Sequence, residues 1–109
     1  MEKIIYNKNV YALLIRGSDQ FKSRGVNFVT KNKDLLQLGF ISHKKKHLIK
    51  PHIHKKNKRI ISYCTEILLI KEGTLKIQFY NEKGINIKKD KKLYKNDIII
   101  LFKGGMVLR

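Results

Sequence analysis

The segment EGTLKIQFY, residues 72–80, decides the fold class. Its Glu72-Gly73 pair predicts a tight turn, and residues 75–80 alternate with a period of two. Such alternation is typical of a half-buried strand, because successive strand side chains point to opposite faces of a sheet. Leu75, Ile77 and Phe79 are expected on one face, and Lys76, Gln78 and Tyr80 on the other.

Similar short apolar segments, rich in Ile, Val, Phe and Tyr, fill the rest of the chain and are separated by Gly, Asn, Asp and Lys clusters. This punctuation predicts about nine or ten short strands and no good helix, which favours a sandwich or barrel in a single domain over residues 1–109. The expected strands are 4–6, 11–15, 26–30, 36–40, 47–54, 60–71, 75–80, 85–87 and 98–102, with a weak strand at Leu93.

Two of these segments carry further information. Residues 4–6 and 11–15 are expected to pair as a hairpin around Asn7-Lys8-Asn9. The segment 98–102 is apolar on both faces, so it is expected to be central or covered.

Composition bounds the class of protein. At 109 residues with 42% hydrophobic residues, the chain fits one globular domain, and a homodimer interface can add to its small stability margin. No segment is long and apolar enough for a membrane span, and the first ten residues lack the apolar run of a signal peptide. Cys64 is the only cysteine, which excludes an internal disulfide and favours a cytoplasmic location. We expect its thiol to be buried and inert.

The chain carries 25 lysines and arginines against 8 acidic residues, a net charge of +17. A nucleic-acid-binding surface is one interpretation. Arginine, however, is the better residue for bidentate phosphate contacts, and only four positions are arginine. The lysines are spread along the chain and accompany abundant Ile and Asn, as AT-rich codons would produce. We therefore interpret them as solvated, and a nucleic-acid partner is the disfavoured alternative.

The segment Pro51-His52-Ile53-His54 is the most informative for function. On a strand, side chains at i and i+2 share a face, so His52 and His54 would direct two imidazoles into one space. Imidazole is a common ligand of Zn, Fe, Ni and Cu. An isolated His-x-His pair also occurs without any metal, so the pair needs a third ligand nearby.

Glu66 supplies a candidate third ligand. It begins an apolar segment, where a charged residue is costly to bury alone, and it shares strand parity with Leu68 and Ile70. A carboxylate beside two histidines forms a metal site of the two-His-one-carboxylate kind. Alternatively, Glu66 pairs with Arg59 or a lysine at the rim of the fold.

The pattern His52-x-His54, a carboxylate, six residues and Gly73 resembles the first motif of the cupin superfamily. Residues 96–105, NDIIILFKGG, look like its second motif, which opens with Gly-Asp and runs through an apolar strand to a glycine-rich turn. The resemblance covers about residues 36–105 and is closest to small bacterial cupins, some associated with surface-polysaccharide synthesis. It implies a jelly-roll barrel that holds a divalent Zn, Fe, Mn or Ni ion on His52, His54 and Glu66.

The sequence departs from the cupin pattern at several positions. Eleven residues, 55–65, separate His54 from Glu66 where the family has only a few. Lys46 and Asn96 replace family glycines. Met106 stands where related cupins carry the last ligand histidine, so metal binding is expected to be weak or lost.

The C-terminal residues suggest that the cupin barrel is incomplete at that end. Related small cupins read Gly-Gly-His-Gly-Phe here. Loss of the first base of CAT-GGT-TTT followed by A gives ATG-GTT-TTA, which encodes the Met-Val-Leu of residues 106–108. A truncated or frameshifted cupin is therefore expected, with unpaired strand edges and uncovered apolar side chains in residues 98–102.

Three functional hypotheses follow. The first is a cupin-type protein that binds a metal and a small polar, sugar-related ligand, with any reaction assisted by the metal. Gln37, Tyr63 and Phe79 are candidate pocket residues, although ordinary core packing is the better interpretation of the aromatic pair. The second is a truncated, non-catalytic cupin without a working site. The third is a basic, nucleic-acid-binding β-barrel.

Overall fold

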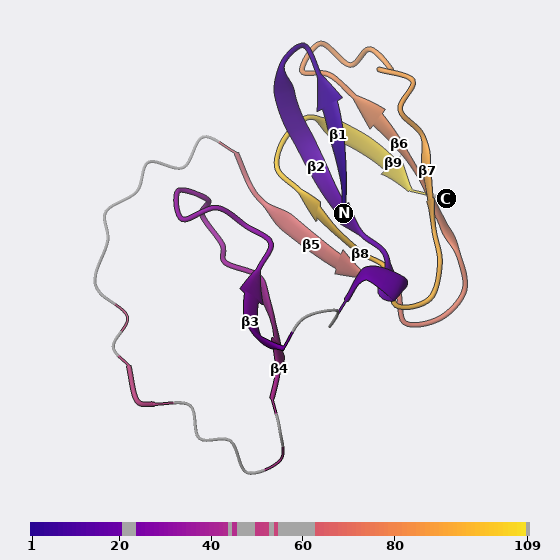
Figure 1. The fold of residues 1–109 in the computed structure, drawn as a ribbon. Coiled ribbons are helices and arrows are strands. Elements are labelled where there is room, and N and C mark those ends of the chain that lie inside the picture. Colours follow the sequence, from indigo (N-terminus) through magenta and orange to yellow (C-terminus); the bar gives the residue numbers. More distant parts are fainter. Residues whose placement is uncertain (21–23, 44, 46–49, 53, 55–62, 109) are drawn as a thin grey trace. The chain divides into compact units, whose positions relative to one another are not determined.

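The computed structural model describes residues 1–20, 24–43, 45, 50–52, 54 and 63–108 (Figure 1). Nine strands and one short 3₁₀ helix, η1 (Gly17–Asp19), make up the regular structure of this part. The predicted all-β class is therefore confirmed. The strands are β1 (Glu2–Tyr6), β2 (Asn9–Ile15), β3 (Gly25–Phe28), β4 (Gly39–Ser42), β5 (Glu66–Leu69), β6 (Leu75–Tyr80), β7 (Lys91–Leu93), β8 (Ile98–Leu101) and β9 (Gly105–Leu108).

The chain divides into two compact units. We call residues 1–20 and 63–109 the two-sheet unit, because its strands form a four-stranded and a three-stranded sheet. We call residues 21–62 the hairpin unit, because β3 and β4 form its two-stranded sheet. The prediction of one domain over residues 1–109 stays a prediction.

The predicted N-terminal hairpin is confirmed. Strands β1 and β2 pair antiparallel, with Tyr6 opposite Asn9, and Asn7 and Lys8 occupy the turn with φ of 49° and 63°. Two successive positive φ values are the signature of the type I′ turn, whose twist matches that of the flanking strands. The side-chain amide of Asn9 donates to the Asn7 carbonyl at 3.0 Å, which helps to hold this turn.

Strand β8 is central in the four-stranded sheet, whose order is β1-β2-β8-β5. All four of its residues are buried, on both faces of the strand, which confirms that this apolar segment is covered. The expectation of uncovered apolar side chains in 98–102 was wrong for the four residues of β8, which are buried, with β2 and β5 flanking the strand on its two sides.

The predicted alternation of 75–80 is also confirmed, since Ile77 and Phe79 are fully buried. In the three-stranded sheet, of order β7-β6-β9, strand β6 is central. Residues 105–108 form β9, with Met106 opposite Phe79. No strand was expected there, because the segment was interpreted as the remnant of a lost continuation.

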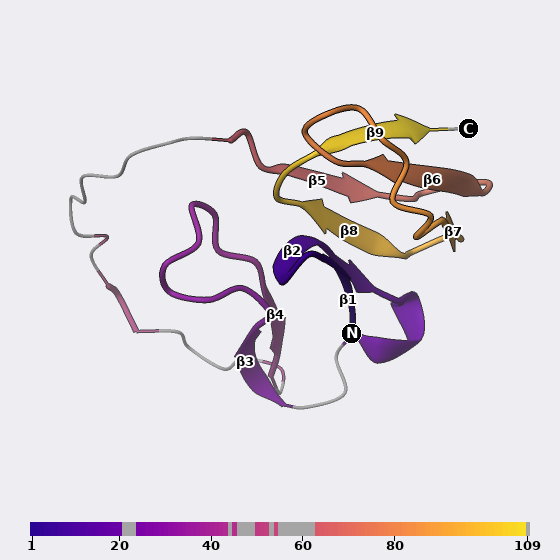
Figure 2. The ribbon, with the colours of Figure 1, turned by 90° about the horizontal axis from the view of Figure 1, so that it is seen from above.

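One apolar core lies between the two sheets, which Figure 2 shows as two stacked layers. Each sheet contributes side chains from one face, as in other sheet-on-sheet packings. The largest fully buried members are Ile4, Leu14, Ile77, Phe79, Leu93 and Ile99. The described strands thus form layered sheets, and none of these sheets closes into a barrel.

The strand expected over 36–40 begins later, at Gly39, because its first half belongs to a hydrogen-bonded loop. The Gln37 side chain donates to the carbonyls of Lys31 and Asp34, and the Leu38 N–H donates to Thr30 Oγ1. These bonds use the polar groups that a strand would have paired. Leu36 is 47% exposed and lies outside the strand.

Other strand boundaries also needed correction. The segment 60–71 contains a strand only from Glu66 to Leu69, with residues 60–62 outside the described part. Residues 50–52 and 54 are not in a strand, and the rest of 47–54 lies outside the described part. At 85–87 only one bridge forms, between Asn86 and Tyr80.

Gly104 provides a test of the close approach between β9 and the N-terminal hairpin. Its φ is +82°, and an added Cβ would lie 2.6 Å from the Tyr80 carbonyl oxygen and 2.7 Å from the Tyr11 ring. We expect Gly104→Ala to lower the free energy of unfolding by roughly 2–4 kcal/mol, from backbone strain and overpacking together.

Gly84→Ala is the matched control in urea unfolding. Gly84 has a φ of +79°, but nothing lies within 4 Å of its added Cβ, so only the backbone strain of about 1 kcal/mol is expected. Equal losses in the two variants would show that the region around Gly104 is not closely packed.

Candidate functional site

The two predicted histidine ligands lie next to each other. The ring centroids of His52 and His54 are 5.1 Å apart, with ring planes inclined by 56°, and both residues are exposed. The Nδ1 atom of His52 lies 3.3 Å from the Lys50 carbonyl oxygen. A carbonyl can only accept, so Nδ1 carries the proton of a neutral His52 ring, and its Nε2 keeps a free lone pair.

The spacing of the two rings suits a shared metal ion. With Zn–N distances of about 2.0–2.1 Å and a tetrahedral angle, the centroids of two imidazoles on one ion lie about 5 Å apart. The observed 5.1 Å is close to this value. The predicted reason for the proximity, a shared strand face, does not apply, because His52 and His54 are not in a strand.

Glu66 begins β5 in the two-sheet unit, opposite Leu101 of β8. Directly opposed residues share a face of an antiparallel sheet, and Leu101 belongs to the core. Glu66 is therefore on the core-facing side of β5, as its parity with Leu68 predicted, but it is exposed because it stands at the strand end. It makes no ion pair or hydrogen bond within the described part, so a described lysine is not its partner, and Arg59, the other alternative partner, lies outside the described residues.

The three predicted ligands belong to different units. His52 and His54 lie in the hairpin unit, and Glu66 lies in the two-sheet unit. Among the residues that the structure describes, no group of three or more His, Cys, Asp and Glu side chains is gathered as a metal site. The two-His-one-carboxylate set thus stays a prediction.

The candidate pocket residues have other roles. The Gln37 amide binds the loop carbonyls described above and lies 3.2 Å from Thr30 Oγ1. Phe79 is a core residue, as the packing alternative proposed. The Tyr63 hydroxyl donates to Glu82, which raises the pKa of Tyr63, and the Lys103 ammonium lies 5.6 Å from its ring centroid. Cys64 is exposed, so the expected burial of its thiol was wrong.

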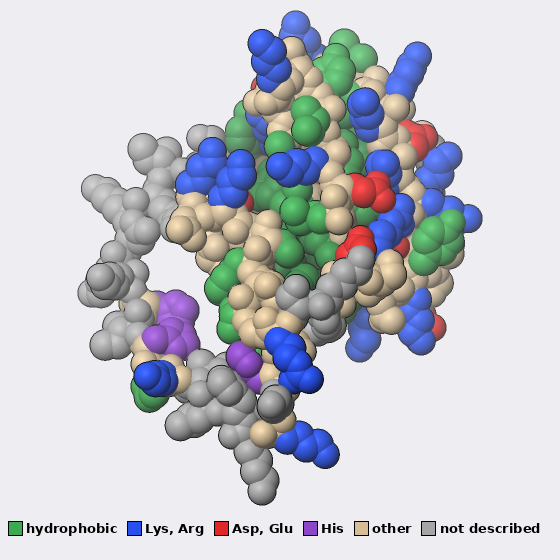
Figure 3. Space-filling model, in the orientation of Figure 1, with side chains coloured by type: hydrophobic (Ala, Val, Ile, Leu, Met, Phe, Trp, Pro, Cys, Tyr) green, Lys and Arg blue, Asp and Glu red, His purple; other side chains and the backbone are tan. Residues whose placement is uncertain are grey.

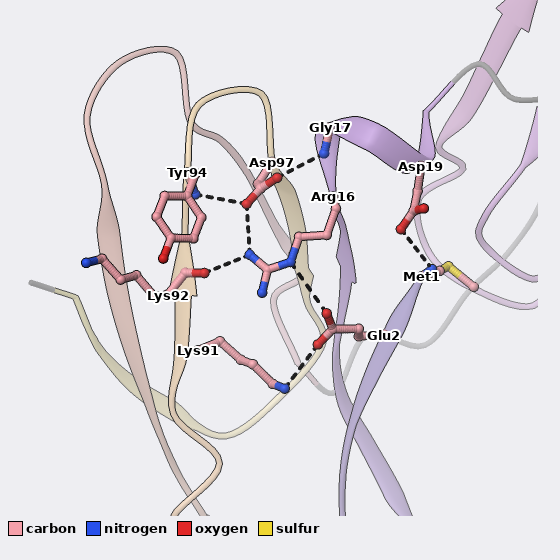
Figure 4. A network of polar contacts seen from close by, with 9 residues as sticks. All are labelled: Met1, Glu2, Arg16, Gly17, Asp19, Lys91, Lys92, Tyr94 and Asp97. Atoms are coloured by element: carbon pink, nitrogen blue, oxygen red, sulfur yellow. Dashed lines mark hydrogen bonds and ion pairs between the residues drawn. The ribbon is translucent and has the colours of Figure 1, made fainter.

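Sequence analysis did not predict the polar cluster that is centred on Asp97 (Figure 4). The Asp97 carboxylate is 4% exposed and accepts from the N–H of Gly17 at 2.9 Å and the N–H of Tyr94 at 2.8 Å. Arg16 Nη1 donates to it at 2.9 Å. The only signal was the Asn96-Asp97 pair, which was interpreted solely as a family motif.

The cluster continues towards the surface through Arg16. The Arg16 guanidinium also donates to the Lys92 carbonyl at 2.7 Å and to Glu2 at 3.4 Å, and Lys91 bonds the other Glu2 oxygen at 3.0 Å. The side chain and backbone contacts join β1 and β2 of one sheet to β7 of the other. These bonds use both carboxylate oxygens of Asp97 and both of Glu2, so we interpret the cluster as a structural network.

Opposing effects set the pKa of Asp97. Burial alone would raise it, but the N–H groups of Tyr94 and Gly17 and the Arg16 cation together hold the pKa of Asp97 below its ordinary value. A carboxyl group with a lowered folded-state pKa stabilises the fold above its unfolded-state pKa, which is about 3.9, and loses that contribution as the pH falls through the folded value.

No family model matches the chain, and no curated protein or solved structure matches it at a significant level. In the described residues, no helix has the length and apolar character needed to cross a membrane.

The Asp97 cluster predicts a pH-dependent loss of stability. Asp97→Ala leaves two N–H groups and the partly buried Arg16 without their acceptor, so we expect a loss of about 3–5 kcal/mol in unfolding free energy at pH 7. In urea titrations, the difference in unfolding free energy between wild type and variant should become smaller below about pH 4. Asp90→Ala is the control, because its only ion pair, with Lys76, is exposed and 3.8 Å long, and it should cost less than about 1 kcal/mol. A gap for Asp97→Ala that is constant from pH 7 to pH 3 would contradict this role.

Proposed function

We propose that the protein binds a divalent transition-metal ion through the imidazoles of His52 and His54. The observation that carries this proposal is their ring separation of 5.1 Å, which suits two imidazoles on one ion. The bond between His52 and the Lys50 carbonyl supports it further, because it fixes one tautomer and leaves Nε2 for the metal. Their exposure means that the ion would keep water or ligand in its other positions.

Glu66, the predicted carboxylate ligand, belongs to the two-sheet unit, so the proposed site consists of the two imidazoles of the hairpin unit. Met106 packs against the core from β9, opposite Phe79, so this position faces the interior of the two-sheet unit. Its thioether is a weaker ligand for hard divalent ions than the histidine of related cupins, and the proposed affinity is accordingly modest.

The broader proposal is a cupin-type protein in which the metal holds a small polar, sugar-related metabolite. The two layered antiparallel sheets and the order of the two motifs support the cupin assignment. Open coordination positions could polarise a bound oxygen atom or activate water. The reaction itself is not part of the proposal, because one fold hosts many chemistries.

Isothermal titration of the metal-free protein with Zn²⁺ and Ni²⁺ tests the proposal. We expect one bound ion per chain, with affinity lowered at least about tenfold in His52→Ala and in His54→Ala, because each removes one of two imidazole ligands. Affinity should also fall with falling pH, since protons compete for the imidazole nitrogens.

His43→Ala is the matched control, because it removes a described histidine of the same unit that is outside the pair. Its affinity should equal that of wild type. Equal metal binding by wild type and a His52→Ala/His54→Ala variant would refute the proposal and favour a non-catalytic protein of the same fold.

A further inference from the structure

The positive charge of this chain is unevenly divided between its two units. The two-sheet unit has 13 lysines and arginines and 7 acidic residues. The hairpin unit has 12 lysines and arginines in 42 residues, and Asp34 is its single acidic residue. All four histidines also belong to the hairpin unit. Its excess of +11 is therefore most of the net charge of +17.

The acidic side chains of the two-sheet unit are used internally. Six of the seven have a described cationic or phenolic partner, and Glu66 is the exception. In the hairpin unit, Asp34 accepts from the Lys31 N–H at 2.8 Å. The unit therefore has eleven more cationic residues than carboxylates. Figure 3 shows how few acidic side chains accompany the lysines and arginines on the face in view.

The β3–β4 hairpin adds an exposed aromatic surface to this charge. Val26 is opposite Ile41 and Phe28 is opposite Gly39, so these side chains share one face of the two-stranded sheet. Val26, Phe28 and Ile41 are 46%, 62% and 50% exposed. The Phe28 ring lies against Gly39, where an added Cβ would be 3.0 Å from it. The Cδ1–Cε1 side of the ring therefore lies close to the Gly39 backbone, and the residue remains largely open to solvent.

We propose that the β3–β4 hairpin face is a binding surface for single-stranded nucleic acid. A base would stack on Phe28, and the exposed Arg24 and Lys31, just before and just after this strand, would contact the phosphates. An aromatic platform between cations is the usual design for single strands, because every base has a stacking face and the backbone is anionic. An acidic protein would gain from the charge but has no bases to stack on Phe28.

Fluorescence anisotropy with a labelled 20-nucleotide oligothymidylate, in EDTA to exclude metal effects, tests the proposal. We expect Phe28→Leu to weaken binding about tenfold, while Phe28→Tyr, which keeps a stacking ring, binds like wild type. Arg24→Gln/Lys31→Gln should reduce the slope of log K against log[NaCl] by about 1.4, as expected for two lost phosphate contacts.

The charge-matched control is Lys83→Gln/Lys89→Gln in the two-sheet unit, where both residues are exposed and have no described carboxylate partner. It removes the same charge and should leave the salt slope within about 0.5 of wild type if the phosphate contacts are local to the hairpin. Three results would each overturn the proposal: equal effects of the two double variants, unchanged binding by Phe28→Leu, or polyglutamate of the same length binding as tightly as the oligonucleotide. Tighter binding of a duplex of the same length would also reject the single-stranded assignment.

Discussion

The Asp97 carboxylate is the interaction on which the two-sheet unit depends. It directly precedes β8, and it accepts three hydrogen bonds, from the N–H groups of Gly17 and Tyr94 and from the Arg16 guanidinium. The Arg16 guanidinium also donates to the Lys92 carbonyl of β7 and to Glu2 of β1. Through Arg16, one buried carboxylate therefore connects strands of both sheets. A buried carboxylate is tolerated only when hydrogen bonds and a counter-charge replace its water. Here two of the three bonds come from Arg16 and Gly17, which are distant in sequence, and the third comes from the nearby Tyr94. The registry of β8 between β2 and β5 is fixed at the same point, because Ile70 bonds to both Asn96 and Asp97.

The sequence predicted those features whose causes are local. The Asn7-Lys8 turn and the alternation of 75–80 depend on neighbours in the chain, and both are observed. Strand β9 and the short span of β5 depend on partners far away in sequence. Residues 105–108 become a strand because they pair with β6, and residues 63–65 lack such a partner in the described part. The loop around Gln37 was not predicted either, because a side-chain amide there makes hydrogen bonds in place of those between paired strands.

The candidate metal site separates into a part that the sequence could predict and a part that it could not. The face of Glu66 followed correctly from parity with Leu68, because β5 is a regular strand there and is paired with β8. The proximity of His52 and His54 was predicted from a shared strand face. That reason was wrong, because the period-two rule holds only within a strand and neither residue is in one. Their rings are nonetheless 5.1 Å apart, because residues two apart in an irregular segment are also close in space. The pairing of the imidazoles is thus a property of this local segment, and it does not depend on the layered sheets.

The charge distribution bears on the interpretation of the lysines as solvated, which stays a prediction. Lysines spread evenly by codon bias should be matched by acidic residues to a similar degree everywhere, and the two units differ sharply in this respect. The two-sheet unit neutralises part of its charge through pairs such as Lys91 with Glu2 and Lys95 with Glu72. In the hairpin unit the same lysines have a single carboxylate among them, so folding itself does not benefit from their density and like-charge repulsion opposes it. An anionic partner of the kind proposed above would offset this repulsion, in a unit that also exposes Phe28 and the two histidines.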